Sequence, residues 1–316
     1  MILAIITIGI LTVSNVLAKD EAGQNHDYRT FEIGGVVNYG KIHDSYTSDL
    51  TIYVAGNQFM VMEKLIQDFQ SKNPDIKKIY LETIPPGQIL KSHILKQGMV
   101  NGEKTAQNPD VFASVNLGHL KKLKAKNIMD DYMIYTHNKL ELMIAEGNPK
   151  HIKGAKDLAR KDLVKSLPNP LTEGIFKFYG SAMLKKLGIY QAVTHDKKCK
   201  SCWAIKDETY FTARHHRETP YRIEHGQADV GIVWATEVQH AKDQKRKLEG
   251  VKISNAYNMG DKVGYAIGIL KTGRNVYNAT RYLGYLGTKD AQNIYTSYGF
   301  IKADSEDLKL KPIPIK

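Results

Sequence analysis

Apolar runs alternate with amphipathic segments between residues 49 and 116. Residues 50–55, LTIYVA, form a β-branched and aromatic run that predicts a buried parallel strand. Residues 59–74 carry apolar side chains at helical spacing and end at Asn73-Pro74, where a helix is expected to stop. The alternation continues with a strand over 76–84, a helix over 88–98 and a strand over 109–116. This order predicts an α/β fold with a parallel sheet.

A second α/β series follows. Its predicted elements are a strand and turn (139–149), a short helix (152–160), a strand ending in a loop (162–170), a helix (174–188), and a helix, turn and apolar strand (219–238). The chain then returns to a strand over 263–270 and two helices within 275–300. We therefore expect two similar α/β units, the first of them completed by the C-terminal residues.

The first eighteen residues contain no charged side chain, and Ile2 to Val13 form a compact apolar block. Because Val16-Leu17-Ala18 then precedes a polar stretch, we predict a signal peptide over residues 1–18, cleaved after Ala18. The block is preceded by no Lys or Arg, so an uncleaved N-terminal anchor is the alternative. Residues 19–48 are polar and mixed, which fits a leader or an added edge element. Since no other stretch is apolar enough to span a bilayer, we expect a soluble mature protein.

The net charge is +12, with 45 Lys and Arg against 33 Asp and Glu. These basic residues are scattered rather than clustered, and an exported protein rarely meets nucleic acid, so we expect no nucleic-acid partner. A basic surface raises the local concentration of small anions. The alternative is a solvated basic surface with no steering role.

The two cysteines, Cys199 and Cys202, stand in a C-x-x-C pair. Export favours a short-loop disulfide. A redox pair is a second possibility, and a metal site completed by His195, His215 or His216 is a third. The chain contains no phosphate-loop, dinucleotide, G-x-S-x-G or H-E-x-x-H motif, so we expect neither a cofactor nor an enzyme.

Five stretches in a fixed order resemble the type II periplasmic solute-binding proteins, and most of all the molybdate-binding-like branch of ABC transporter substrate-binding proteins. The stretches are LTIYVAGNQ (50–58), DVFASVN (110–116), LMIAEGNPKHIKGAKDLA (142–159), GQADVGIVWATE (226–237) and YLGYLGTKDAQNIYTSYGF (282–300). The resemblance implies two α/β lobes, residues 49–135 plus 264–316 and residues 136–263, joined by two crossover strands that form a hinge. It also implies a periplasmic monomer that binds a small ligand between the lobes and passes it to an inner-membrane ABC permease.

In such a fold the ligand lies where parallel strands end and helices begin, because helix N-termini offer unpaired N–H groups and partial positive charge. The candidate residues of the first lobe are Gly56, Asn57, Gln58, Gly87, Gln88, Ser114 and Asn116. The family usually has Ser at the position of Asn57, so this residue departs from a tetrahedral-oxyanion site. The alternatives are a helix cap at Asn57, a tight turn at Gly87 and a capping role for Ser114.

The candidates of the second lobe are Thr172, Gly174, Arg214, His215, Arg217, Thr219 and Trp234. Thr172 and Gly174 resemble the family's second-lobe loop. Two Arg and two His precede a helix expected to begin near Pro220 with Thr219 as its cap, and a bound carboxylate or phosphate would compensate this charge. The alternatives are a solvated basic loop paired with Glu218 and Glu208, and a core position for Trp234.

The predicted ligand is therefore a small anion, either an oxyanion such as molybdate, tungstate or sulfate, or a small carboxylate or phosphorylated metabolite. A periplasmic metal-ion-binding protein is the alternative, since the chain has eleven His and eighteen Tyr. Ferric-iron relatives use paired Tyr, and the nearest approach here is Tyr295 and Tyr298. A redox protein and a surface adhesin are further alternatives.

Overall fold

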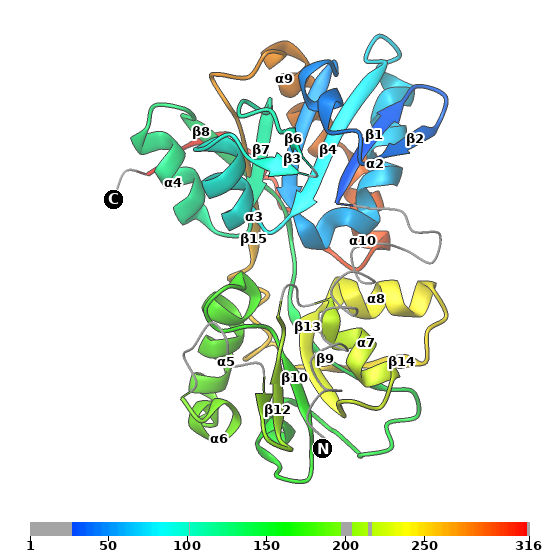
Figure 1. Ribbon diagram of the computed structural model, residues 1–316, viewed down its shortest axis with the longest axis vertical. Coiled ribbons are helices and arrows are strands. Elements are labelled where there is room, and N and C mark those ends of the chain that lie inside the picture. The colour runs from blue at the N-terminus through cyan, green and yellow to red at the C-terminus, as the bar shows by residue number, and fades with distance from the viewer. Residues whose placement is uncertain (1–26, 101, 197–203, 214–216, 315–316) are drawn as a thin grey trace. The chain divides into compact units, whose positions relative to one another are not determined.

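The computed structural model describes residues 27–100, 102–196, 204–213 and 217–314 (Figure 1). The chain forms two compact units. The first unit runs up to His137 and resumes at Gly264, and the second unit is Asn138–Val263. Both units consist of a mixed sheet with helices, which confirms the predicted α/β class.

The main sheet of the first unit has the strand order β16-β8-β15-β7-β3-β4-β1-β2, with β17 paired to β8. The strands are β1 (Tyr28–Glu32), β2 (Val36–Tyr39), β3 (Leu50–Ala55), β4 (Lys78–Ile84), β7 (Val111–Ser114), β8 (Asp131–His137), β15 (Gly264–Ile269), β16 (Ile301–Lys302) and β17 (Lys311–Pro312). Strand β3 pairs in parallel with both β4 and β7, and all six of its residues are buried. Burial on both faces explains its uninterrupted apolar sequence.

The helices of the first unit cover both faces of this sheet. They are η1 (Ile42–Tyr46), η2 (Gly56–Gln58), α2 (Phe59–Lys72), α3 (Pro86–Gln88), the π-helix η3 (Ile89–Ile94), α4 (Leu117–Ala125), α9 (Val276–Leu286) and α10 (Lys289–Ser297). Helices η3 and α4 pack on one face with Tyr53, Tyr80 and Phe112. In Figure 1, α2, α9 and α10 lie on the other side. A two-stranded ribbon, β5 (Met99–Val100) and β6 (Glu103–Lys104), completes the unit.

The sheet of the second unit has the order β11-β12-β10-β13-β9-β14. Its strands are β9 (Leu140–Ala145), β10 (Lys165–Leu167), β11 (Ala204–Ile205), β12 (Thr209–Phe211), β13 (Val230–Trp234) and β14 (Leu248–Lys252). Its helices are η4 (Ala155–Ala159), the π-helix η5 (Ile175–Gly180), α5 (Ser181–Lys186), α6 (Tyr190–Thr194), α7 (Glu218–Glu224) and α8 (Ala235–Asp243). Figure 1 shows α5 and α6 on one side of β10 and β12, and α7 and α8 on the other.

Several elements differ from the sequence patterns. The single helix predicted over 174–188 is a π-helix that passes into α5. The patterns did not reveal α4 or β8, which lie between the two predicted units. Residues 28–46, a leader or added edge in the sequence, form β1, β2 and η1, and the two strands extend the sheet beyond β4.

Four predictions fall partly or wholly outside the described residues. They concern the signal peptide (1–18), the pair Cys199 and Cys202, and the basic residues Arg214 and His215. Across the described ranges, no helix has both the length and the apolar character needed to cross a membrane.

Two buried ionisable side chains are hydrogen-bonded to each other within the first unit. Glu82 on β4 is fully buried, and its Oε1 lies 2.5 Å from Nδ1 of the buried His93 on η3. Burial raises the pKa of the Glu82 carboxyl above its ordinary value, and the hydrogen bond from His93 opposes that rise. A side chain at Gly98 would collide with the His93 ring, since a Cβ there would lie 2.4 Å from Cδ2. The pair therefore depends on a glycine at this position.

We predict that His93→Ala lowers the free energy of unfolding by about 3–5 kcal/mol near neutral pH, because it leaves the Glu82 carboxylate buried without its partner. Urea denaturation followed by circular dichroism measures the loss. The matched control is Lys309→Ala, which removes the exposed partner of Glu306 at 2.7 Å and should leave stability unchanged.

The loss should shrink at lower pH. Without His93 the pKa of Glu82 in the folded protein rises further. A carboxyl group whose pKa is raised by folding stabilises the folded protein most at a pH below that pKa, and this stabilisation is lost as the pH rises through it. The variant should therefore recover part of its deficit between about pH 8 and about pH 5. An equal deficit at both values would show that lost packing, rather than the buried charge, causes the effect.

Candidate functional site

Parallel pairing in the first unit brings the ends of three strands to one edge of the sheet. Strand β3 is parallel to β4 and β7, so Ala55, Ile84 and Ser114 end on the same side. The first-unit edge, as we call it, comprises residues 56–58, 85–88 and 114–119. All seven first-lobe residues predicted from the sequence lie on it: Gly56, Asn57, Gln58, Gly87, Gln88, Ser114 and Asn116.

The side chains of Asn57 and Gln58 point into the unit and are buried. Asn57 Nδ2 donates to the Tyr265 hydroxyl. Gln58 Oε1 accepts hydrogen bonds from the hydroxyls of Tyr135 at 2.9 Å and Tyr295 at 3.2 Å. Burial raises the pKa of Tyr135 and Tyr295 well above the ordinary value, so both hydroxyls keep the protons that they donate. Asn57 therefore does not cap α2, and that alternative is wrong.

The amide nitrogen of Gln58 is a buried donor with no acceptor. Both tyrosine hydroxyls donate to Oε1, and among the described residues Nε2 finds no hydrogen-bond partner. Leaving such a donor unpaired costs about 1–3 kcal/mol. Gln58 immediately precedes the 14-residue helix α2, whose N-terminus adds partial positive charge at the same place. The arrangement favours a group that accepts hydrogen bonds.

Tyrosines from the strands beside the unit boundary hold this loop. Tyr135 lies on β8, which ends at His137, and Tyr265 lies on β15, which begins at Gly264. Their rings pack edge to face, with centroids 6.2 Å apart, and Tyr135 also contacts Tyr295 at 5.6 Å. The loop after β3 is thus fixed by the two strands through which the chain leaves and re-enters the first unit.

The loop after β4 forms one helical turn, α3, that leads into η3. Gly87 is partly exposed and Gln88 is exposed. A Cβ at Gly87 would lie 3.6 Å from Cε1 and Nε2 of His119. The second loop of the edge therefore passes directly beside the ring of His119 on α4.

The third loop is organised by Ser114 and Asn116. Ser114 is fully buried, and its Oγ accepts the backbone N–H of Asn116 at 3.0 Å and lies 2.9 Å from His119 Nδ1. Asn116 caps α4, since its Oδ1 accepts the N–H of Gly118 at 2.9 Å. Sequence reasoning missed His119 because α4 was not recognised. An Asn followed three residues later by a polar His at a helix start was the available signal.

The second unit has an equivalent edge. Strand β10 is parallel to β12 and β13, so Leu167, Phe211 and Trp234 end together. The second-unit edge, as we call it, comprises residues 168–174, 212–213, 217–219 and 234–237. It includes Thr172, Gly174, Arg217, Thr219 and Trp234 from the sequence prediction, whereas Arg214 and His215 lie outside the described residues.

A buried polar network shapes the first loop of the second-unit edge. Asn169 Oδ1 accepts the backbone N–H groups of Leu171 at 2.9 Å and Thr172 at 3.3 Å. Glu173 Oε1 accepts the N–H of Asn169 at 3.1 Å and the hydroxyl of Thr212. Thr172 itself is exposed. The buried Glu173 therefore links two loops of the edge, a role that the sequence did not indicate.

Helix α7 begins at Glu218, two residues before the expected start. Glu218 Oε2 accepts the N–H of Ala213 at 3.0 Å and pairs with Arg222 at 2.9 Å. Thr219 lies within the helix, fully buried, with its hydroxyl 3.0 Å from Ser166 Oγ. The prediction that Thr219 caps the helix is wrong. The partly exposed Arg217 occupies the N-cap position instead.

Two further residues of the prediction have a structural role. Trp234 is buried, and its ring contacts Tyr179 edge to face at 5.6 Å. Its backbone N–H donates to Glu237 Oε2 at 3.0 Å, which starts α8. Trp234 thus occupies a core position, which was the alternative to a role in ligand binding. Glu208, named as a partner of the basic loop, lies 2.6 Å from His195.

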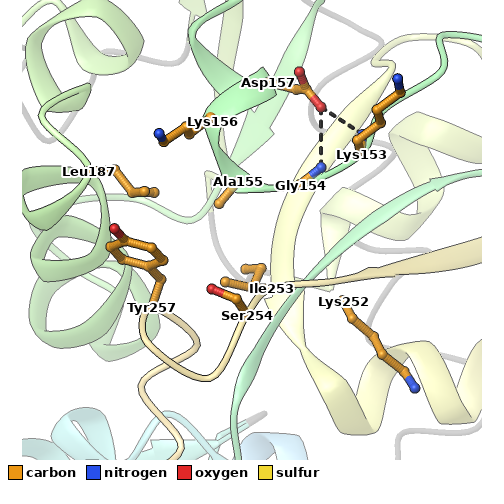
Figure 2. Close-up of a pocket in the computed structure, with 10 residues that line it drawn as sticks. All are labelled: Lys153, Gly154, Ala155, Lys156, Asp157, Leu187, Lys252, Ile253, Ser254 and Tyr257. Carbon is orange, nitrogen blue, oxygen red and sulfur yellow. Dashed lines mark hydrogen bonds between the residues drawn. The ribbon is translucent and has the colours of Figure 1, made fainter.

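An open pocket of about 390 Å³ lies elsewhere in the second unit, lined by residues 153–157, Leu187, 252–254 and Tyr257. Asp157 accepts the N–H groups of Lys153 at 2.6 Å and Gly154 at 3.2 Å, so these donors are already used. Figure 2 shows the ammonium groups of Lys153 and Lys252 directed away from the pocket. None of the lining residues was predicted from the sequence to bind a ligand, and their hydrogen-bond donors do not point toward a common position in the pocket.

A metal centre was the alternative function. Within the described ranges, no group of three or more His, Cys, Asp or Glu side chains is placed to hold a metal ion. His215 and His216 fall outside those ranges.

The comparisons with known proteins agree on the fold. The periplasmic molybdate-binding protein of Azotobacter vinelandii matches with a TM-score of 0.62 and 18% identity, over 81% of this chain and 100% of that one. The sulfate-binding protein SubI of Mycobacterium tuberculosis gives 0.61 and 14%, over 81% and 87%. The iron-bound protein HitA of Pseudomonas aeruginosa gives 0.58 and 16%, over 83% and 90%. The search of curated proteins gave no match.

The family described as "Bacterial extracellular solute-binding protein" matches residues 50–301. This range includes all five stretches that carried the resemblance and both edges described above. The match confirms the class predicted from those stretches, and the chain belongs to the family of bacterial extracellular solute-binding proteins.

Proposed function

We propose that this protein is exported to the periplasm, binds a small anion with residues of both edges, and delivers it to an ABC permease in the inner membrane. The observation that carries the anion assignment is the composition of the first-unit edge. Residues 56–58, 85–88 and 114–119 contain no Asp or Glu, and their polar side chains are amides, a hydroxyl and an imidazole. Two helices of nine or more residues, α2 and α4, begin there. Neutral donors at helix N-termini suit an anion.

The first-unit edge alone suits a metal cation poorly. Hard cations take carboxylate and carbonyl oxygens, and softer ones take several imidazole or thiolate ligands. The edge offers one imidazole, and the N–H groups of the Gln58 amide would repel a cation. Periplasmic metal binding nevertheless remains the second candidate, because iron-bound HitA shares the fold.

The second-unit edge supports a ligand with a carboxylate or phosphate group. Arg217 stands at the start of α7, and Arg214 and His215 precede it in sequence. A guanidinium forms paired hydrogen bonds with either group. One fold relative is a phospholactate-bound structure of PEB3, and its TM-score is 0.54 at 14% identity. A carboxylated or phosphorylated metabolite thus joins molybdate, tungstate and sulfate as a proposed ligand.

The remaining parts of the proposal follow from the sequence. Residues 1–18 direct export and are removed, Cys199 and Cys202 form a disulfide, and the mature protein acts as a monomer without catalytic turnover or cofactor. The permease is its protein partner. Hinge closure between two lobes would bring both edges to one ligand.

We predict that the mature chain, residues 19–316, gains thermal stability from one anion in a panel of molybdate, tungstate, sulfate, phosphate, small carboxylates and L-phospholactate. A ligand at about 100 times its dissociation constant stabilises by about 2.7 kcal/mol. Differential scanning fluorimetry with sodium chloride at matched ionic strength as control detects it, and titration calorimetry gives the affinity. Stabilisation by a transition metal alone, lost on adding a chelator, would instead support metal binding.

We predict that Arg217→Ala weakens binding of the best anion by about tenfold or more, because a charge-assisted hydrogen bond contributes about 1.5–3 kcal/mol. The matched control is Arg246→Ala, which removes a surface arginine of the same unit paired with Glu224. Titration calorimetry compares the variants. Equal affinity of wild type and Arg217→Ala would exclude Arg217 from the site while leaving the other residues in place.

We predict that the exported protein begins at Lys19. N-terminal sequencing of protein recovered from a periplasmic extract checks the cleavage point after Ala18. Protein retained in the membrane fraction with residues 1–18 intact would show the uncleaved anchor.

A further inference from the structure

Two helical segments of the first unit carry charge of one sign. Residues 85–98 and 111–129 contain six Lys and no Arg, Asp or Glu, whereas the chain as a whole mixes 45 Lys and Arg with 33 Asp and Glu. Four of the six lysines are exposed, two on or just after η3 and two on or just after α4. We call these four residues the lysine face: Lys91, Lys96, Lys122 and Lys126.

The fold places η3 and α4 next to each other. Helix η3 follows β4 and α4 follows β7, the two strands that flank β3 in parallel. Both helices pack on the same face of the sheet, where Leu90 and Ile94 share one core with Leu120 and Leu123. The turn α3 that leads into η3 also passes beside the first turn of α4 (Figure 1). Because the apolar side chains point into the core, the lysines lie on the outer surface of this helix pair.

The lysine face is not neutralised by nearby carboxylates. Within the described ranges, none of its four lysines forms an ion pair with Asp or Glu. Asp130, which follows α4, is shared by two further lysines, Lys124 and Lys271, each 2.6 Å away. Hydrogen bonds from these two ammonium groups lower the pKa of Asp130 below its ordinary value. The carboxylate and its two lysines therefore still add one positive charge beside the face.

Helix electrostatics account for the lysine face only in part. The dipole of α4 favours cations in its last turn, but Lys122 and Lys126 are four positions apart, where like charges repel. Several cations elsewhere in the described structure have carboxylate partners, as Arg160 has Asp162 at 2.7 Å. A face that concentrates lysines without such partners suits a negatively charged partner outside the chain.

The composition of the lysine face favours an extended anionic surface over a protein. Protein–protein interfaces are enriched in Arg, Met and aromatic residues and depleted in Lys. Helices η3 and α4 contain no Arg, Met, Phe, Trp or Tyr, and none of their large apolar side chains is exposed. A Lys ammonium is a hydrated point charge on a flexible stem, which can follow an array of phosphate groups without a fixed geometry.

We propose that the lysine face docks the protein onto a bilayer surface that contains anionic phospholipids. Each lysine near such a surface strengthens binding by about fivefold, and the attraction is lost beyond about 8 Å at physiological salt. The contact is with headgroup phosphates. It goes beyond the proposed function and uses no residue of either edge. Such binding would keep the protein at the membrane in which the proposed permease lies.

Vesicle co-sedimentation of the mature chain, residues 19–316, tests the partner. We expect binding to vesicles of equal parts phosphatidylglycerol and phosphatidylcholine, and none to phosphatidylcholine alone. Binding should be lost in about 1 M sodium chloride, where the screening length falls to about 3 Å. Hydrogen–deuterium exchange on the vesicle-bound wild type locates the contact, and residues 86–98 and 117–126 should gain protection while residues 140–252 do not.

A fourfold variant separates the lysine face from the net charge. Changing all four of its residues to Gln should weaken binding to the phosphatidylglycerol vesicles by at least about fiftyfold. The matched control removes four charges from exposed lysines of the second unit, and should bind within about threefold of wild type. Its changes are Lys153→Gln, Lys156→Gln, Lys161→Gln and Lys242→Gln.

Each outcome supports or overturns the proposal. Equal losses in the two fourfold variants would assign binding to net charge and overturn the role of the lysine face. No wild-type binding to phosphatidylglycerol vesicles would overturn the lipid partner, and binding of a polyglutamate peptide in its place would assign an acidic protein segment. If a variant does not fold, the wild-type exchange pattern decides, since protection confined to the second unit overturns the proposal. Failure of the anion panel would leave the vesicle result standing, and the reverse also holds.

Discussion

The candidate site depends on the parallel pairing of β3 with its two neighbours. Parallel strands run in one direction, so the loops that follow β3, β4 and β7 must emerge on one side of the sheet. Residues separated by about sixty positions in sequence, such as Gly56 and Asn116, then belong to one surface. The second unit repeats this with β10, β12 and β13. Each unit therefore brings three short loops together at one edge of its own sheet.

Much of this arrangement was predictable from local pattern. The uninterrupted apolar run of β3 and the helical spacing of α2 reflect burial, which periodicity reports well, so both elements and their connecting loop were expected. Helix α4 was missed because its nine residues contain four Lys or Gly and only a thin apolar face of Leu120 and Leu123. His119 was missed along with it.

The direction of a polar side chain was the harder question. From the sequence, Asn57 could be a helix cap or a hydrogen-bond donor to a ligand. Its hydrogen-bond partner, Tyr265, lies 208 positions later in the chain. Thr219 similarly reads as a cap, although it bonds to Ser166 inside the unit. In both cases a partner distant in sequence decides the role, and no local pattern carries that information. The family resemblance predicted which loops lie at the ends of the parallel strands, and the structure shows which of their side chains are bonded inside the unit.

The bonds between the loop after β3 and the buried tyrosines constrain how this protein can diverge or be redesigned. Replacing Asn57 with the serine usual in the family would lose the hydrogen bond to Tyr265, and an apolar residue at Gln58 would deprive Tyr135 and Tyr295 of their shared acceptor. The side chains of the loop and the three tyrosines therefore constrain one another, and a change in one is tolerated only with a matching change in its partner. Changing any one of these five side chains would break at least one hydrogen bond that holds the loop.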